Sequence, residues 1–402
     1  MSLMAVDEAL AKVLANAKPL PVEHVTLSQA AGRVLADNVG AKVTQPPADV
    51  SAMDGYAVRA ADIAAAPARL KIVGEVGAGH PFSGTVGEGE AARIFTGAVV
   101  PAGADTVVVQ ENATRDGDFV VINVSASAGK NIRRAGLDFR RGEILLHRGR
   151  PLSARDLMLA AAMNHAALPV HRAARVAILG TGDELILPGT VQKFGQVFYS
   201  NGFALIALAQ GEGATAIDLG IVPDSVEETT DAVRRAREAG ADILVTCGGA
   251  SVGEHDVVQK SLAAEGLELS FWKVAMRPGR PVMHGRLGGM QVLGLPGNPV
   301  SSYVCALLFL VPLIRRLQGR RDLSLATGFA RVSQDLQAND ERMDFLRATL
   351  DGAPGDPVAT PLPVQDSSMM AALAKADCLL IREPHAAPLK AGAVCPIVKL
   401  TF

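Results

Sequence analysis

The strongest constraint on the fold is the segment of residues 242–256, where an apolar run passes directly into a glycine-rich loop. Residues 243–246 read Ile-Leu-Val-Thr, and such a run without polar alternation is typical of a strand buried on both faces of a parallel sheet. Glycines then permit backbone angles closed to other residues, beside side chains that carry oxygen ligands. These loop residues are Gly248, Gly249, Gly253, Ser251, Glu254 and Asp256. The loop suits a phosphate held with a divalent cation, and equally a strand-to-helix turn that Glu254 or Asp256 caps.

Apolar runs of this kind recur and alternate with helical stretches. Strands are expected at residues 176–179, 216–221, 269–274 and 291–295, and helices at residues 201–210, 225–239 and 299–317. The second helix begins with a capping box of Ser225 and Glu228. The third has Asn298 placed to cap it and Pro299 at its first helical position. The alternation predicts a doubly wound α/β domain of three αβα layers over residues 175–322.

Three unusual loops are expected at one edge of this sheet, because ligands of such sheets bind outside the carboxyl ends of the strands. The loops are residues 180–184, 247–256 and 295–299. A fourth loop, residues 276–281, follows closely after Lys273 and carries Arg277 and Arg280 between prolines. Three cations within eight residues on a stiffened backbone favour an oxyanion site, and the alternative is a basic surface turn.

The rest of the chain is expected to form three further domains. A discontinuous helical and mixed N-terminal domain covers residues 1–48 and 140–174, in which a helix at residues 4–17 packs with a helix from Ser153 to about Met163. A mostly β domain is inserted at residues 49–139, with Asp54 and Tyr56 displayed at the tip of a turn. A β-rich, barrel-like C-terminal domain covers residues 323–402. The expected strands are residues 70–73, 93–95, 106–110, 119–124, 143–146, 329–332, 345–350, 378–382 and 394–400, with one helix near residues 367–375.

Composition excludes several classes of protein. The formal charge of −2 on 402 residues indicates no general attraction to nucleic acid or membrane. The four cysteines, Cys247, Cys305, Cys378 and Cys395, are too widely spaced for a metal site and suit structural thiols in a reducing cytoplasm. The N-terminus has no signal-peptide pattern, and the apolar run of residues 304–314 is too short to span a bilayer. Dinucleotide, Walker and nucleophile-elbow motifs are not found.

Seven motifs in order along the chain together resemble the MoeA family of molybdopterin molybdenumtransferases, which also occurs as the E domain of gephyrin. They are residues 51–57, 96–98, 131–134, 181–184, 248–253 with Asp256, 277–281 and 295–301. The resemblance implies insertion of molybdate into adenylylated molybdopterin with Mg²⁺ and release of AMP. It also implies a central domain like molybdopterin adenylyltransferase, a transient contact with that enzyme, and an elongated homodimer. In the family the cleft lies between the third domain of one subunit and the second domain of the other.

The resemblance also implies roles for individual residues. The catalytic residues are Asp54, Thr96, Glu184, Asp224 and Asp256, and the metal ligands are Glu184, Glu254 and Asp256. The substrate-binding residues are Asp138, Gly248, Gly249, Ser251, Gly253, Lys273, Arg277, Arg280, Pro296, Pro299, Arg342 and Ser367. Arg277 and Arg280 stand where the family pattern has lysines, and the planar fork of arginine binds an oxyanion differently from an ammonium group.

Two other functions compete with this interpretation. The α/β domain alone would resemble a molybdopterin adenylyltransferase, but the segment of residues 53–56 and two extra β domains argue against that activity. A gephyrin-like scaffold is the other alternative, and the sequence, with no partner domain attached, favours a free-standing enzyme.

Overall fold

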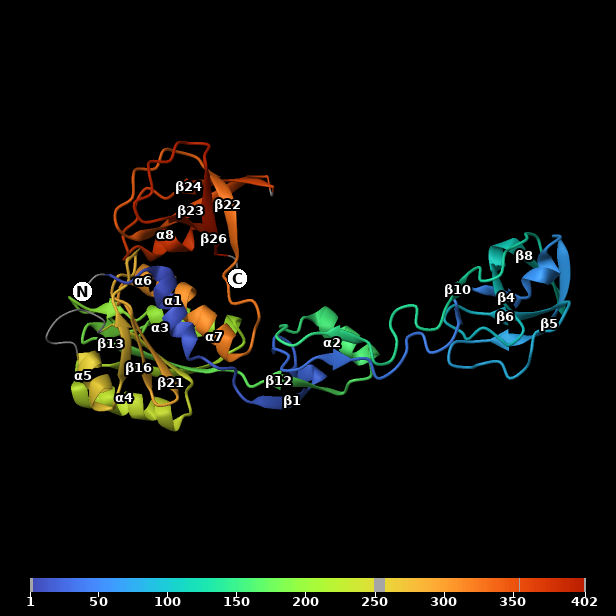
Figure 1. Ribbon diagram of the computed structural model, residues 1–402, viewed down its shortest axis with the longest axis horizontal. Helices are drawn as coiled ribbons and strands as arrows, with labels where there is room; N and C mark the ends of the chain where they lie inside the picture. Colours follow the sequence, from blue (N-terminus) through green and yellow to red (C-terminus); the bar gives the residue numbers. More distant parts are fainter. Residues whose placement is uncertain (1–2, 249–256, 354, 401–402) are drawn as a thin grey trace.

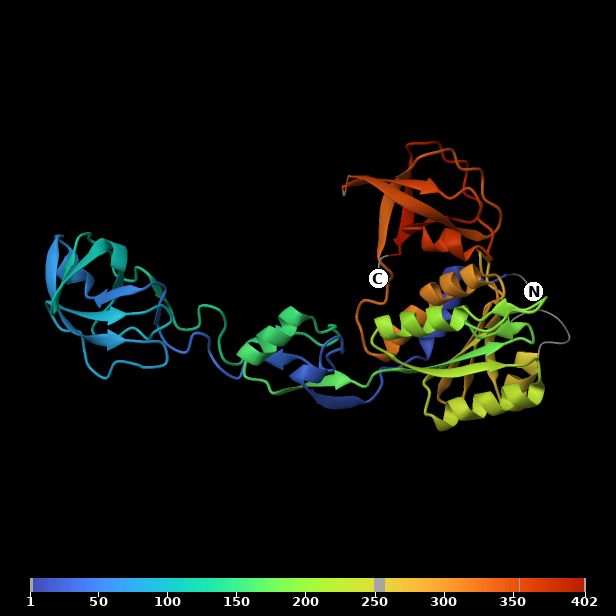
Figure 2. The same cartoon turned by 180° about the vertical axis from the view of Figure 1, so that it is seen from behind.

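The computed structural model describes residues 3–248, 257–353 and 355–400. These residues form an α/β unit that carries a C-terminal β barrel on one side (Figure 1). On another side the chain extends through a small unit built on β1 and β12 to a separate β unit at the far end. The view from behind shows the same arrangement (Figure 2). The expected multidomain α/β class is confirmed.

The sheet of the α/β unit is mostly parallel. Its order in the described residues is β16 (Thr215–Val222), β13 (Arg175–Thr181), β17 (Ile243–Cys247), β21 (Met290–Leu295), β20 (Met283–Leu287) and β18 (Glu268–Trp272). The first four strands run parallel, and β20 pairs antiparallel with both β21 and β18. Every residue of β17 is buried, as predicted. Strand β20 was missed because His284, Gly285 and Arg286 interrupt its apolar pattern.

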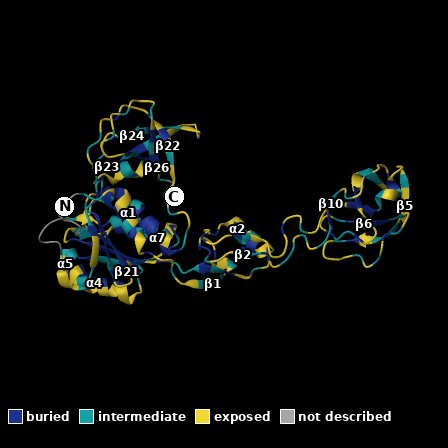
Figure 3. Cartoon of the chain, viewed as in Figure 1, coloured by how far each residue is buried: buried dark blue, intermediate teal, exposed yellow. Residues whose placement is uncertain are grey.

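Helices cover both faces of this sheet, so the predicted three layers are confirmed. One face carries α3 (Asn201–Gly211) and the continuous helix of α6 (Pro299–Cys305), the π-helical η4 (Ala306–Leu310) and α7 (Val311–Leu317). The other face carries α4 (Val226–Glu238) and α5 (Val257–Ala264). Alternate residues of β13 serve the two cores: Ile178 packs on the first face and Leu179 on the second. Buried strands lie between helices whose outer sides are exposed (Figure 3).

The helix of α6, η4 and α7 is a core helix of the α/β unit. It has 19 residues and is apolar enough to cross a membrane by length and composition, so the argument that the run of residues 304–314 is too short does not apply to it. However, 78% of its apolar window is buried inside the fold. Val304, Leu310 and Ile314 lie in the same core cluster as β13 and β17.

The packing of the N-terminal helix differs from the expectation. α1 (Val6–Ala15) buries Val6, Ala9 and Val13 in the core of the α/β unit, against η4 and α7. α2 (Ala154–Ala162) lies instead in the core of the small unit. The expected pairing of these two helices is therefore wrong. The apolar stripe of α1 meets the apolar residues of the central core helix, whereas the buried residues of α2 are only Asp156 and Ala160.

The small unit is held by short antiparallel pairs. β1 (Val22–Thr26) pairs with β12 (Ala167–His171), and β2 (Val39–Gly40) pairs with β11 (Ile144–Leu146). The 3₁₀ turn η1 (Leu27–Gln29) follows β1. At the start of α2, Asp156 accepts hydrogen bonds from the backbone N–H and the hydroxyl of Ser153, at 2.8 and 2.6 Å. The sequence predicted a helix that starts at Ser153, and these hydrogen bonds fix where the chain turns into α2.

The far unit is a six-stranded sheet in the described chain. Its order is β7 (Thr106–Val109), β4 (Gly55–Val58), β6 (Glu90–Ile94), β5 (Ala68–Val76), β9 (Phe119–Ile122) and β8 (Ala113–Asp116). The 3₁₀ turns η2 (Ala60–Ile63) and η3 (Gln110–Asn112) lie between strands, and β3 (Val50–Ser51) pairs with β10 (Ile132–Arg133) where the chain enters and leaves.

Tyr56 is not displayed on a turn, contrary to expectation. β4 lies between β6 and β7, and all four of its residues, including Tyr56 at 6% exposure, are buried. A Cβ on Gly55 would lie 1.9 Å from the carbonyl oxygen of Val108, so only glycine allows this close approach. Of Asp54 and Tyr56, only Asp54, which precedes the strand, is exposed.

The C-terminal unit is a closed barrel, as its β-rich sequence indicated. The strands β22 (Thr327–Val332), β23 (Met343–Ala353), β24 (Asp356–Pro361), β25 (Cys378–Arg382) and β26 (Val394–Lys399) pair in a ring that the contact of β23 with β25 closes. α8 (Met370–Ala374) lies between β24 and β25 in the chain. A two-residue strand from the α/β unit, β19 (Met276–Arg277), pairs in parallel with β23 and joins the two units. All four cysteines are free and buried, as expected.

Candidate active site

A cleft of about 1300 Å³ opens at the carboxyl ends of the parallel strands. Gly180 of β13 is in register with Cys247 of β17, and Cys247 with Leu295 of β21. The loops that follow therefore start side by side at one sheet edge. Seven of the predicted site residues line the cleft: Glu184, Asp224, Gly248, Lys273, Arg280, Pro296 and Pro299.

Gly248 begins the glycine loop in a conformation that other residues rarely adopt, with φ of 100°. A Cβ there would lie 2.5 Å from the carbonyl oxygen of Thr181 in the neighbouring loop. Its N–H donates to the carbonyl oxygen of Leu295 at 3.3 Å. Gly248 thus joins the three loops at their base. The predicted residues Gly249, Ser251, Gly253, Glu254 and Asp256 lie outside the described residues.

One wall of the cleft is acidic. Glu184 follows β13 and Asp224 follows β16, and both line the cleft. Burial raises the pKa of the Asp224 carboxyl, and the negative charges of Asp183 and Glu184 raise it further. Within the described residues, neither Glu184 nor Asp224 forms an ion pair. The wall therefore favours a cation, although the described part of the chain contains no group of three or more His, Cys, Asp or Glu side chains that could hold a metal ion.

Basic residues line the cleft toward the other end of the sheet, where β20 and β18 lie. Lys273 and Arg280 line the cleft as predicted, and Lys260 of α5 joins them. Lys273 has φ of 77°, and its N–H donates to the carbonyl oxygen of Val282 at 3.0 Å, which holds this strained position. Lys260 was missed because α5 was not predicted, although Val258 and Leu262 have helical spacing.

The third loop connects the cleft to the barrel. The side chain of Asn298 donates through Nδ2 to the hydroxyl oxygen of Ser367 at 2.9 Å, and the N–H of Val300 donates to the carbonyl oxygen of Ser367 at 3.1 Å. Asn298 therefore makes no side-chain cap on α6, contrary to expectation, because Ser367 of the barrel takes its amide. Asn201 of α3, which was also missed, donates to the carbonyl oxygen of Gly297 at 2.8 Å.

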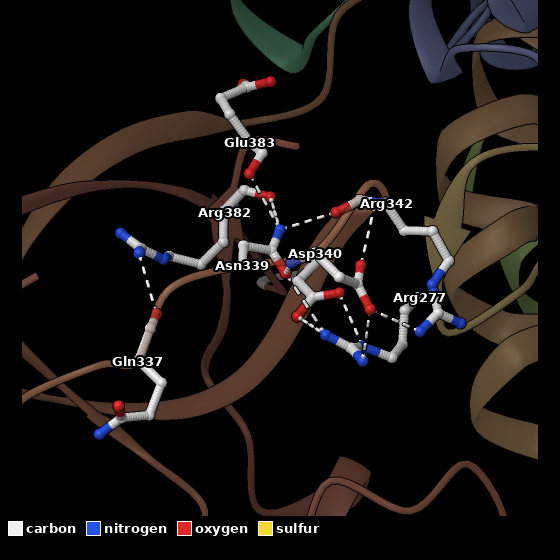
Figure 4. Close-up of polar contacts among 8 residues, drawn as sticks. Arg277, Gln337, Asn339, Asp340, Arg342, Arg382 and Glu383 are labelled. Carbon is white, nitrogen blue, oxygen red and sulfur yellow. Dashed lines mark hydrogen bonds and ion pairs between the residues drawn. The ribbon is translucent and has the colours of Figure 1, made fainter. Parts of the chain in front are cut away.

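Two predicted cations, Arg277 and Arg342, do not line the cleft, and each forms ion pairs inside the chain. Arg277 donates to Asp344 through Nε at 2.8 Å and to Asp340 through Nη1 at 3.2 Å. Arg342 donates to Asp340 through Nη2 at 2.8 Å. The side chains converge at the junction of β19 with the barrel (Figure 4). Sequence alone could not find Asp344, which lies 67 positions from Arg277.

The remaining predicted residues lie far from the cleft in the same chain. Asp54 and Thr96 belong to the far unit, which the small unit separates from β13 and β17 (Figure 1). Asp54 accepts hydrogen bonds from the N–H and the hydroxyl of Thr96 at 2.7 and 2.8 Å, and both lower the pKa of its carboxyl. Asp138 is exposed in the segment that leaves this unit. A single chain does not bring these three residues to the cleft.

The sequence also matches known families along its length. Residues 4–164 match the MoeA N-terminal region (domain I and II), residues 177–316 a probable molybdopterin binding domain, and residues 330–400 the MoeA C-terminal region (domain IV). The fold and its cleft therefore define a multidomain protein built around a molybdopterin-binding α/β domain.

Named relatives identify the family. The chain is 33% identical to molybdopterin molybdenumtransferase from Haemophilus influenzae over 98% of both chains, and 34% identical to molybdopterin molybdenumtransferase 2 from Mycobacterium tuberculosis over 98% of both. The crystal structure of a molybdopterin biosynthesis MoeA protein from Pyrococcus horikosii matches it with a TM-score of 0.86 and 29% identity over 100% of both chains. The chain belongs to the molybdopterin molybdenumtransferase family, and it is a transferase of molybdenum cofactor biosynthesis.

Proposed function

We propose that the chain inserts molybdate into adenylylated molybdopterin and releases AMP. The observation that carries this proposal is a single cleft that is lined by both acidic and basic side chains. Adenylylated molybdopterin carries several negative phosphate oxygens, and molybdate adds two more negative charges. Bringing these anions together requires strong local compensation. Lys260, Lys273 and Arg280 line the cleft, and none of them forms an ion pair with another described residue. No described carboxylate competes for these charges, which would bind the phosphate groups of the substrate.

The acidic wall suits Mg²⁺. Burial raises the pKa of Asp224, and the negative charges of Asp183 and Glu184 raise it further, so a cation here would find uncompensated negative charge. Glu184 would hold the ion, together with Glu254 and Asp256 of the glycine loop as the family resemblance implies. When bound, Mg²⁺ neutralises phosphate oxygens and stabilises the AMP that leaves. The backbone N–H of Asp224 donates to the carboxylate of Asp183 at 3.0 Å, and Gly248 keeps the three loops together at their base.

A second copy of the chain would complete the cleft, and we infer a homodimer on that ground. Asp54 and Thr96 are held together by two hydrogen bonds in the far unit, which lies away from the α/β unit of their own chain (Figure 2). The segment between β14 (Leu185–Ile186) and β15 (Val197–Phe198), beside the cleft, exposes Val191 and Phe194 fully. Such apolar exposure favours a covered surface.

The proposal also includes the surroundings of the reaction. The four buried free thiols support a reducing cytoplasm. The adenylylated substrate must come from an enzyme that adenylylates molybdopterin, and a transient contact with that enzyme would transfer it directly.

The test is to mix the purified protein with adenylylated molybdopterin, Mg²⁺ and molybdate, and to measure AMP. The expected result is AMP release that depends on both molybdate and Mg²⁺. Consumption of ATP with unmodified molybdopterin would favour the adenylyltransferase alternative. A protein that leaves adenylylated molybdopterin intact under all these conditions would refute the proposal.

A further inference from the structure

Two guanidinium groups from different units converge on one carboxylate oxygen. Oδ2 of Asp340 accepts from Nη1 of Arg277 at 3.2 Å and from Nη2 of Arg342 at 2.8 Å (Figure 4). Oδ1 of the same carboxylate accepts from the backbone N–H of Arg342 at 2.9 Å. These hydrogen bonds and charges, those of Arg342 first, lower the pKa of Asp340 to about 2. Asp340 is therefore an anion throughout the physiological range of pH.

Arg342 has a donor that Asp340 does not use. Nε of Arg342 is buried and has no hydrogen-bond partner. A buried unpaired donor of this kind is costly, so its presence indicates a missing acceptor. Arginine presents its donors as a planar fork that matches oxyanions. Asp340 takes one side-chain donor from each arginine, and Asp344 takes the Nε and Nη2 donors of Arg277.

Asp340 and Asp344 have different roles in this cluster. Asp344 is buried, with 8% of its side chain exposed, and it binds Arg277 through two donors. It therefore holds the guanidinium of Arg277 in place without help from Asp340. Asp340 has 34% of its side chain exposed, so its carboxylate is already partly hydrated and can move into solvent. Asp340 is the anion of the cluster that can be displaced.

We propose that Asp340 is an internal counter-ion of an oxyanion site, and that a tetrahedral dianion displaces its carboxylate from between Arg277 and Arg342. The inference rests on the proposed function, in which that dianion is molybdate. Asp340 occupies the site with one negative charge, so an incoming anion must exceed it in charge and in number of acceptors. Singly charged anions do not meet this condition. Asp340 is thus a specificity-determining residue, because it sets the affinity at which an oxyanion enters.

The substitution Asp340→Asn tests this role. Asparagine keeps the size of the side chain and the oxygen that accepts from the backbone N–H of Arg342, but it removes the competing charge. Molybdate binding measured by calorimetry at low ionic strength should tighten on the order of tenfold, the effect of one lost charge-assisted hydrogen bond. Discrimination between molybdate and a singly charged anion such as formate should fall. Asp340→Ser, which also removes the charge, should act in the same direction.

Asp335→Asn is the matched control. Asp335 lies on the same barrel and accepts from Nζ of Lys390 at 2.7 Å and from the backbone N–H of Ala391 at 2.9 Å, but it contacts neither arginine. The molybdate affinity of Asp335→Asn should equal that of the wild type. Asp340→Glu keeps the negative charge, so its molybdate affinity should be close to that of the wild type and weaker than that of Asp340→Asn.

The outcomes separate this inference from the proposed function. If wild-type protein releases AMP but folded Asp340→Asn binds molybdate no more tightly than Asp335→Asn, the counter-ion role is overturned while the proposed function stands. If neither wild type nor Asp340→Asn binds molybdate, the counter-ion role is also overturned. If Asp340→Asn binds molybdate more tightly than the wild type, but the wild type releases no AMP, the counter-ion role is supported and the proposed reaction is rejected.

Discussion

Replacing Gly248 by alanine perturbs the point where the three loops of the cleft meet. The residue has φ of 100°, and a non-glycine residue held there costs about 1–3 kcal/mol. The added Cβ would lie 2.5 Å from the carbonyl oxygen of Thr181, whereas ordinary contact begins at 3.4 Å. The loops after β13 and β17 must therefore separate by about 0.9 Å, and a misplacement of about 1 Å in an active site costs about 100-fold in rate. We expect AMP release by Gly248→Ala to fall by about this factor.

Gly266→Ala is the control for backbone strain. Gly266 ends the turn after α5 with φ of 88°, and a Cβ there would meet nothing within 4 Å. It should lose about 1 kcal/mol of unfolding free energy, measured by urea titration, and keep its turnover. AMP release by Gly248→Ala within about threefold of the wild type would refute the reasoning, since the loop contact would then not determine the geometry of the cleft.

The other predictions concern the acidic wall and the dimer. Glu184→Ala should abolish AMP release and leave the thermal unfolding midpoint nearly unchanged, and normal turnover would exclude Glu184 from the site. Asp224→Asn should be more stable than the wild type at neutral pH, because the folded-state pKa of Asp224 is raised and its ionised form opposes folding. That difference should vanish as the pH falls below the ordinary value of 3.8, and urea titrations at pH 3 and 7 measure it. An equal mixture of Asp54→Ala and Glu184→Ala subunits, after exchange, should recover about a quarter of wild-type AMP release if each cleft takes the two residues from different chains. A mixture that stays inactive would contradict the shared cleft.

Much of the α/β unit was predictable because its determinants are local. Apolar runs without alternation identify β13, β16, β17 and β21 as strands of a buried parallel sheet. Once strands are parallel, their carboxyl ends lie at one edge. The loops at Glu184, Gly248 and Pro296 are thereby brought together without further information.

The sequence alone thus determined the class of fold, the edge of the sheet at which the cleft opens and most of the charges that line it. Only the tertiary structure decided that α1 packs on the central core helix, that Tyr56 is buried, and that Arg277 is paired with Asp344. The physical reason is that these depend on which surfaces meet across long separations in the chain. Local patterns set backbone conformation and burial, but the pairing of a charge depends on a partner that no local pattern specifies.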